Sequence, residues 1–202
     1  MNAGRLGFTT GTCAAAAAKV AILALQNDVA ATEVDVALPD GERVKLPVLY
    51  ARRNTVGAEA AIRKNAGDDP DVTDKAVIIA TVRWAEGNET HLLAGDGVGT
   101  GTKPGLSVLP GEPAINPVPR RMILAAAREV TSRPLQITFS IPGGKDLAEK
   151  TFNPRLGVVG GLSIIGTTGR VRPFSATALQ DALKCALNVA AACGVKALVF
   201  VP

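Results

Sequence analysis

The stretch that decides the fold is Gly7–Gln26, which reads GFTTGTCAAAAAKVAILALQ. Its apolar residues Ala16, Val20 and Leu23 recur at helical spacing, and threonines stand just before the alanines. A threonine is a favourable helix N-cap, because its hydroxyl accepts a hydrogen bond from an amide of the first turn that has no partner within the helix. The stretch therefore predicts an alanine-rich helix from Cys13 to Gln26.

The composition around this helix is that of a folded protein. The 202 residues suit one compact domain, or one domain and part of a second. Hydrophobic residues make up 47% of the chain and charged residues 20%, so the chain can bury a core. Aromatic residues are only 3%, and we expect a core of small and aliphatic side chains with few rings for stacking.

The charge and the reactive side chains exclude several classes of function. Lys and Arg exceed Asp and Glu by 22 − 18 = 4, without basic blocks, which favours an anionic small molecule over nucleic acid. Three cysteines without a CxxC pair and a single histidine are too few for a zinc site. The first apolar stretch is interrupted by Lys19 and lacks a basic leader, and no other reaches the ~18 residues of a membrane span. We expect a cytoplasmic protein.

Strands are predicted on both sides of tight turns. Alternating residues flank the turn Pro39-Asp40-Gly41 and predict a hairpin, and a second hairpin is predicted around Glu86-Gly87-Asn88. The expected strands are Glu33–Leu38, Arg43–Val48, Val56–Arg63, Ala76–Val82, Thr90–Ala94, Leu135–Ile141 and Leu162–Ile165.

Two further long helices are predicted. Asn116-Pro117 is a good helix start, and the helix is expected to run to about Ser132. Ser175 is expected to cap a second helix that ends at Gly194 and leads into a strand over Ala197–Val201. A short helix is expected over Lys145–Lys150. The fold class is therefore α+β, with a mixed sheet, hairpins and helices in residues 1–174, followed by the first helix and strand of a truncated α/β domain in residues 175–202.

The start of the first helix is a candidate anion site. Thr9, Thr10, Gly11 and Thr12 would offer hydroxyls, free amides and the positive end of the helix dipole to a carboxylate or phosphate. The alternative is an ordinary threonine cap on a buried helix. Cys13 is either a thiol activated at this position or, more commonly, a small hydrophobic residue.

Residues 95–119 form a long glycine- and proline-rich stretch, and such stretches are usually either functional or disordered. Gly95–Gly101 superficially resembles a dinucleotide-binding loop, but Pro104 prevents the helix that would follow it. The remaining interpretation is a loop that exposes its backbone and carries Asp96 and Lys103, with Glu112, Asn116 and Arg120 downstream. A purely structural glycine loop is the alternative.

Three smaller groups of polar residues are weaker candidates. Asp68, Asp69 and Asp71 lack the other ligands of a calcium loop and are more simply a solvated acidic turn. His91 is expected to be a surface side chain or one with its hydrogen bonds satisfied, rather than a general base. Asn153 and Arg155 stand near Gly160 and Gly161, where a flat ligand could approach the backbone; a turn with a solvated arginine is the alternative.

Six motifs together resemble one known family. They are GFTTGTCAAA (7–16), AGDDPDVT (66–73), GDGVG with TKPGL (95–99 and 102–106), GEPAINPVPR (111–120), TFNPRLG (151–157) and GGLSIIGTTG (160–169). The resemblance is to the cobalt-precorrin-5B C1-methyltransferases (CbiD) of anaerobic cobalamin biosynthesis. Asn65 stands where the family usually has an aspartate, and family members continue beyond Val-Pro into an α/β region.

The resemblance implies transfer of a methyl group from S-adenosylmethionine to C1 of a cobalt-containing tetrapyrrole, which gives cobalt-precorrin-6A, without a metal of the enzyme's own. Such a reaction depends mainly on positioning, and we assign no catalytic residue. The carboxylated substrate is expected to contact Thr9, Thr10, Gly11, Thr12, Lys103, Arg120 and Arg155. The methyl donor is expected to contact Asp96, Glu112, Asn153, Gly160 and Gly161.

Two competing functions stay open. One is a corrinoid-binding fragment without catalytic activity, and the other is a phosphate-transferring enzyme that uses ATP. Pro104 and the lack of a GxxxxGK[ST] loop count against ATP. No nucleic-acid or membrane partner is expected, and a homo-oligomer stays open.

Overall fold

Helix α1 (Thr10–Asn27) lies at the centre of the fold. The computed structural model describes residues 4–27 and 31–199. Every residue of α1 is buried except Leu23, Gln26 and Asn27. The helix packs against α2 (Pro117–Arg128) and against strands β5 (Ala58–Arg63) and β6 (Val77–Trp84). Its small alanine side chains allow this close packing. The predicted helix is confirmed, although it begins at Thr10 rather than at Cys13.

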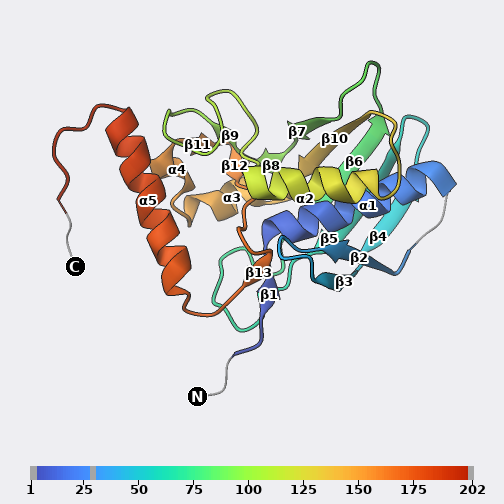
Figure 1. The fold of residues 1–202 in the computed structure, drawn as a ribbon, viewed down its shortest axis with the longest axis horizontal. Coiled ribbons are helices and arrows are strands. Elements are labelled where there is room, and N and C mark those ends of the chain that lie inside the picture. Colours follow the sequence, from blue (N-terminus) through green and yellow to red (C-terminus); the bar gives the residue numbers. More distant parts are fainter. Residues whose placement is uncertain (1–3, 28–30, 200–202) are drawn as a thin grey trace.

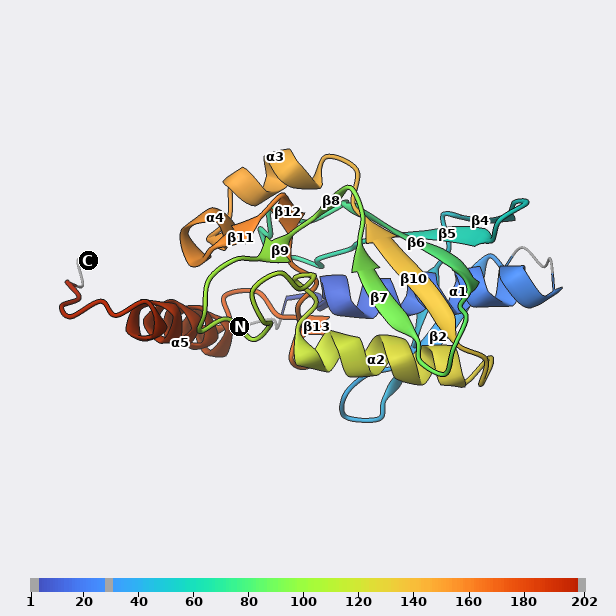
Figure 2. The ribbon, with the colours of Figure 1, turned by 90° about the horizontal axis from the view of Figure 1, so that it is seen from above.

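Five strands form the main sheet, in the spatial order β4-β5-β6-β10-β7. Neighbouring strands are antiparallel except β10 and β7, which are parallel. Figure 2 shows α1 and α2 side by side along this sheet. The strands are β4 (Tyr50–Arg53), β5 (Ala58–Arg63), β6 (Val77–Trp84), β7 (His91–Ala94) and β10 (Leu135–Ser140). The strands expected near β5 and β10 are confirmed, whereas β4 was not predicted.

The predicted hairpin of β6 and β7 is wrong. Strand β10 lies between them, and its residue Ile137 stands opposite Val82 of β6 and Leu92 of β7. All three side chains belong to the core. A turn signal between two strands shows only that the chain reverses, and a third strand can still insert between them.

The hairpin predicted around Pro39-Asp40-Gly41 is confirmed, and ion pairs anchor it to the helices. Strands β2 (Glu33–Ala37) and β3 (Arg43–Pro47) pair with each other. The buried Lys19 of α1 donates hydrogen bonds of 2.8 Å to the carbonyl of Asp35 and 2.6 Å to the carboxylate of Glu129. Arg43 also pairs with Glu129, at 2.9 Å. The network ties the hairpin to α1 and to the end of α2, which stops at Arg128 rather than near Ser132.

The glycine-rich loops of the chain form pairs of strands that are only two residues long (Figure 1). The predicted strand Leu162–Ile165 is reduced to Leu162 in β12 and a single bridge at Ile164. The predicted short helix is confirmed as α3 (Gly144–Glu149), and α4 (Asn153–Leu156) follows it. The short pairs are β1 (Gly7–Phe8) with β13 (Arg170–Val171), β8 (Gly97–Val98) with β12 (Gly161–Leu162), and β9 (Thr100–Gly101) with β11 (Val158–Val159).

Helix α5 (Ala176–Ala192) stands beside the rest of the molecule (Figure 1). Its predicted cap is confirmed, because the Ser175 hydroxyl accepts a hydrogen bond from the Ala178 amide at 3.2 Å. Val189 is its one buried residue. Leu179, Leu183 and Leu187 are exposed.

The strand predicted at Ala197–Val201 is wrong for residues 197–199, which are irregular, and residues 200 and 201 lie outside the described part. The mixed α+β class is confirmed, while the second domain beginning at residue 175 stays a prediction. Among the described residues, no helix combines the length and the apolar character needed to cross a bilayer.

Candidate functional site

The loops marked by the sequence as functional pack together. Gly97 pairs with Gly161, and Thr100 with Val159. The Asn116 amide donates to the carbonyl of Ile164 at 3.0 Å. Segments 95–105, 111–120 and 153–166 are therefore one interlocked unit, although they are far apart in the sequence.

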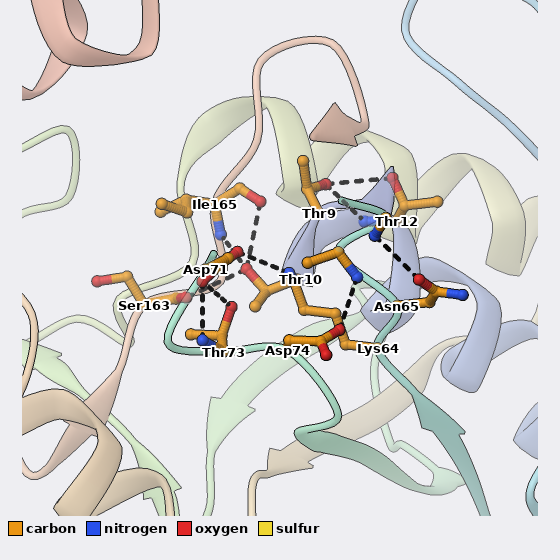
Figure 3. Close-up of polar contacts among 12 residues, drawn as sticks. Thr9, Thr10, Thr12, Lys64, Asn65, Asp71, Thr73, Asp74, Ser163 and Ile165 are labelled. Atoms are coloured by element: carbon orange, nitrogen blue, oxygen red, sulfur yellow. Dashed lines mark hydrogen bonds and ion pairs between the residues drawn. The ribbon is translucent and has the colours of Figure 1, made fainter. Parts of the chain in front are cut away.

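The threonines at the start of α1 are buried, and their side chains form hydrogen bonds within the protein (Figure 3). The Thr9 hydroxyl accepts from the Thr12 amide at 3.2 Å, and the Thr12 hydroxyl donates to the carbonyl of Gly169 at 2.7 Å. The Gly11 amide donates to the carbonyl of Ile165 at 3.0 Å. These groups are satisfied by the chain itself. This geometry favours the structural cap, and the anion-binding role of Thr9, Thr10, Gly11 and Thr12 stays a prediction.

Thr10 begins a line of hydrogen bonds that ends at the glycine pair. Its hydroxyl accepts from the Ile165 amide at 2.9 Å and lies 3.2 Å from the carbonyl of Ser163 (Figure 3). The Ser163 hydroxyl in turn donates to the side-chain carbonyl of Asn153 at 3.4 Å. The side-chain NH₂ of Asn153 donates to the backbone carbonyl of Gly161 at 3.2 Å. The structure thus brings Thr10, Asn153 and Gly161 into one network.

The three predicted cations lie at two places around this unit. The Lys103 ammonium donates to the carbonyl of Arg155 at 3.2 Å, so these two residues are neighbours. Arg120 is in the first turn of α2, directly after Pro119, which packs against Gly11. Across residues 4–27 and 31–199, none of the three cations forms an ion pair with a carboxylate.

The two predicted carboxylates are separated. Asp96 lies 3.2 Å from the ammonium of Lys145 on α3. Glu112 is exposed in another loop, where its carboxylate accepts from the Leu109 amide at 3.3 Å. Only Asp96 is therefore near Gly160 and Gly161, because its partner Lys145 lies on α3, which packs beside them.

A pocket of about 260 Å³ opens between α3, α4 and strands β11 and β12. Both Gly160 and Gly161 line it, together with Lys145 and Glu149. Thr10, Lys103, Arg120 and Asn153 do not line it. This pocket is therefore not a cavity that all of the predicted site residues share.

Lys64 and Asp71 form a buried ion pair that the sequence patterns did not indicate. Lys64 is 2% exposed, and its ammonium donates to the carboxylate of Asp71 at 2.7 Å (Figure 3). Both the amide and the hydroxyl of Thr73 also donate to this carboxylate at 2.7 Å. Burial works to raise the pKa of Asp71, but the bonds from Lys64 and Thr73 hold it below its ordinary value.

The interpretation of Asp71 as part of a solvated turn is wrong for this residue, whose carboxylate is mostly covered. A usable signal was present in the sequence. Lys64 continues the two-residue alternation of β5, in which Ala58, Ala60 and Ile62 face the core.

The structure also settles the surroundings of Cys13 and His91. Cys13 is fully buried, and this burial raises the pKa of its thiol to about 12, so the small hydrophobic residue is confirmed over the activated thiol. His91 is exposed on β7, as expected.

Residues 1–173 match the family model described as CbiD. The chain belongs to the CbiD family. The CbiD match contains every predicted site residue and stops just before the cap of α5.

Named relatives agree with this. The CbiD chain is 57% identical over 196 residues to a cobalt-precorrin-5B C(1)-methyltransferase of Syntrophotalea carbinolica, covering 97% of this chain and 56% of the relative. It is 55% identical over 190 residues to the protein of the same name from Thermus thermophilus, covering 94% of this chain and 51% of the relative. The CbiD chain thus spans about half the length of the curated relatives it matches.

A solved structure supports the fold of this CbiD chain. The 1.9 Å crystal structure of the cobalamin biosynthesis protein CbiD from Archaeoglobus fulgidus is similar with a TM-score of 0.67 and 33% sequence identity. The similarity covers 91% of this chain and 60% of the other.

Proposed function

We propose that this chain carries the ligand-binding loops of a methyltransferase that transfers a methyl group from S-adenosylmethionine to C1 of cobalt-precorrin-5B, giving cobalt-precorrin-6A. Relatives that bear the name cobalt-precorrin-5B C(1)-methyltransferase support the reaction. The structural support is the interlocked unit itself, which carries cations without carboxylate partners among the described residues.

The surface of this unit suits a wide, flat, carboxylated ring. Large apolar side chains in these loops or directly beside them are exposed to solvent: Leu109, Phe152 and Ile165. They would contact the apolar faces of a macrocycle, and burying them against it is favourable. The free cations Lys103, Arg120 and Arg155 would pair with the carboxylates of its rim, with bidentate contacts from the two arginines.

The reaction depends more on the relative position of the two reactants than on acid–base catalysis. A new carbon–carbon bond forms between C1 and the methyl group as the carbon–sulfur bond breaks, and both electrons of the broken bond stay on sulfur. S-adenosylhomocysteine leaves as a neutral thioether. Holding the two reactants in line and excluding water can supply a large part of the acceleration. Asp96 and Glu112 are proposed to stabilise the positive sulfonium before the transfer, and Asp96 is the better placed of the two beside the glycine pair.

Binding measurements test this proposal. The intact chain is titrated in a calorimeter with S-adenosylhomocysteine, with a cobalt corrinoid that carries free carboxylates, and with ATP. Heat from the first two ligands and none from ATP is the expected result. Binding of the corrinoid alone would support the non-catalytic alternative, and binding of ATP alone would overturn the proposal.

Variants locate the ring. Lys103→Ala, Arg120→Ala and Arg155→Ala should each weaken corrinoid binding about 1.4- to fivefold, since exposed ion pairs contribute ~0.2–1 kcal/mol, and the effect should shrink with added salt. Lys45→Ala, an exposed lysine on β3, is the control that should change nothing. Unchanged affinity in all three variants would contradict the assignment.

A further inference from the structure

The pocket between α3, α4 and strands β11 and β12 has features that suit one part of the methyl donor. We infer that it holds the adenosine of S-adenosylmethionine, with Glu149 accepting from the ribose hydroxyls and the Lys145–Asp96 pair binding the amino-acid end. The inference rests on the proposed function and adds to it the location and the direction of the donor.

One wall of the pocket suits a purine. Pro154, Val158 and Val159 give it apolar surface, and Gly160 and Gly161 present backbone rather than side chain. At Gly160, where φ is +88°, no atom lies within 4 Å of the place a Cβ would occupy, so the backbone there faces open space. A flat base can therefore lie against the chain at this point.

The charged lining residues of the pocket come from α3. Lys145 and Glu149 are four residues apart, so they share one face of the helix, and both line the pocket. Glu149 has no ion-pair partner in the described part of the chain. An ionised carboxylate only accepts hydrogen bonds, and the two hydroxyls of a ribose are suitable donors.

The amino-acid end of the donor carries one positive and one negative group, and so does the ion pair that the lining residue Lys145 forms with Asp96. The Lys145 ammonium lies 3.2 Å from the Asp96 carboxylate, and both side chains are largely exposed. Such a pair can open to bind a zwitterion: Lys145 takes the carboxylate, and Asp96 takes the ammonium, which only three carbons separate from the sulfonium that Asp96 is also proposed to stabilise.

The size of the pocket limits how much of the donor it can take. About 260 Å³ is less than the ~300–1,000 Å³ of pockets that enclose a whole drug-sized ligand, so we expect the nucleoside in the pocket and the amino-acid end outside it. Pro154 lines the pocket, and the next residue of α4, Arg155, is one of the proposed ring contacts. Donor and ring would therefore meet at α4.

A second pocket supplies matched controls. It measures about 400 Å³ and lies at the far end of α2 from Arg120, where Arg128 and Glu89 are among its lining residues. It contains none of the predicted site residues. Arg128→Met and Glu89→Gln therefore remove the same charges from a different pocket.

The test is calorimetric titration of the intact chain with two probes, S-adenosylhomocysteine and methylthioadenosine, which lacks the amino-acid end. Lys145→Met should weaken S-adenosylhomocysteine by up to about fivefold and leave methylthioadenosine unchanged, because only the first probe has a carboxylate. Glu149→Gln should weaken both probes by the same factor. The two control variants should bind like the parent chain, and all four side chains are exposed, so folding is retained.

The outcomes separate this inference from the proposed function. If the parent chain binds S-adenosylhomocysteine and both α3 variants bind it equally well, the location is wrong and the methyltransferase proposal stands. If Lys145→Met weakens both probes alike, the proposed direction is overturned. Weakening by Arg128→Met or Glu89→Gln instead would place the donor in the second pocket. If the parent chain binds neither probe, the proposed function itself fails.

Discussion

The ammonium of Lys64 lies 2.7 Å from the carboxylate of Asp71, and the two side chains differ sharply in exposure, at 1% and 25%. Removing one partner of a buried pair leaves the other charge without compensation, which costs ~3–5 kcal/mol. We predict that Asp71→Leu lowers the free energy of unfolding by about this amount. Lys64→Met should cost clearly less, because Asp71 keeps both hydrogen bonds from Thr73 and part of its solvent.

Urea unfolding followed by circular dichroism measures both values. The double variant, with both substitutions, is the control and should recover most of the stability lost in Asp71→Leu. Equal losses in the two single variants, with no recovery in the double variant, would show that the pair does not act as described.

The charge network at the end of α2 makes stability depend on pH. The hydrogen bond from Arg43 outweighs the opposing effect of burial and, with Lys19, lowers the pKa of Asp35 to about 2. Arg43 is also the main cause of the lowered pKa of Glu129. Unfolded carboxyl groups titrate near ~4, so this stabilisation is complete above about pH 4 and is lost as the pH falls towards 2.

Comparison with Arg43→Gln isolates this contribution. The variant should be less stable than the parent above about pH 4, and the difference should shrink steadily as the pH is lowered, because the carboxylates become protonated in both proteins. Urea unfolding at a series of pH values gives the difference. A gap that stays constant down to about pH 2 would contradict the assignment of these carboxylates.

Cysteine reactivity should follow burial. Cys13 is fully buried with its thiol pKa raised to about 12, whereas Cys193 is exposed. Iodoacetamide at mildly alkaline pH should therefore alkylate Cys193 quickly in the folded chain and leave Cys13 unmodified until urea is added. Peptide mass spectrometry reads both sites. Equal rates at Cys13 and Cys193 in the folded chain would contradict the burial of α1.

Helix α5 should contribute little to the stability of the rest. A proline in the interior of a helix costs ~3 kcal/mol or more. Ala18→Pro in the buried helix α1 should abolish the main unfolding transition, whereas Ala182→Pro in α5 should leave its midpoint nearly unchanged. Differential scanning calorimetry measures the midpoint of the unfolding transition for each variant. A large shift of the midpoint for Ala182→Pro would contradict a domain boundary near residue 174.

Local patterns predicted the helices and the first hairpin, because these depend on spacing, caps and turns within a few residues. They could not predict that β10 inserts between β6 and β7, since sequence distance says nothing about which strands become neighbours. The burial of Lys64 follows from the two-residue alternation of β5, but its pairing with Asp71 does not, because that partner is seven residues away, across a loop.

The candidate site divides in the same way. The motifs marked the loops that interlock, including Asn153 and the glycine pair. They did not identify Lys145 or Glu149, because the pocket exists only once α3 packs beside β12. They also suggested free amides at the start of α1, where the fold satisfies these groups with Ile165 and Thr9.

The most direct test of the methyltransferase proposal is to follow the methyl group itself. The intact chain is incubated with cobalt-precorrin-5B and S-adenosylmethionine that carries an isotopically labelled methyl group, and the ring product is analysed by nuclear magnetic resonance. The account predicts that the label appears at C1 of the ring in amounts that grow with protein concentration. Label that stays entirely in S-adenosylmethionine, while both ligands are shown to bind, would contradict it.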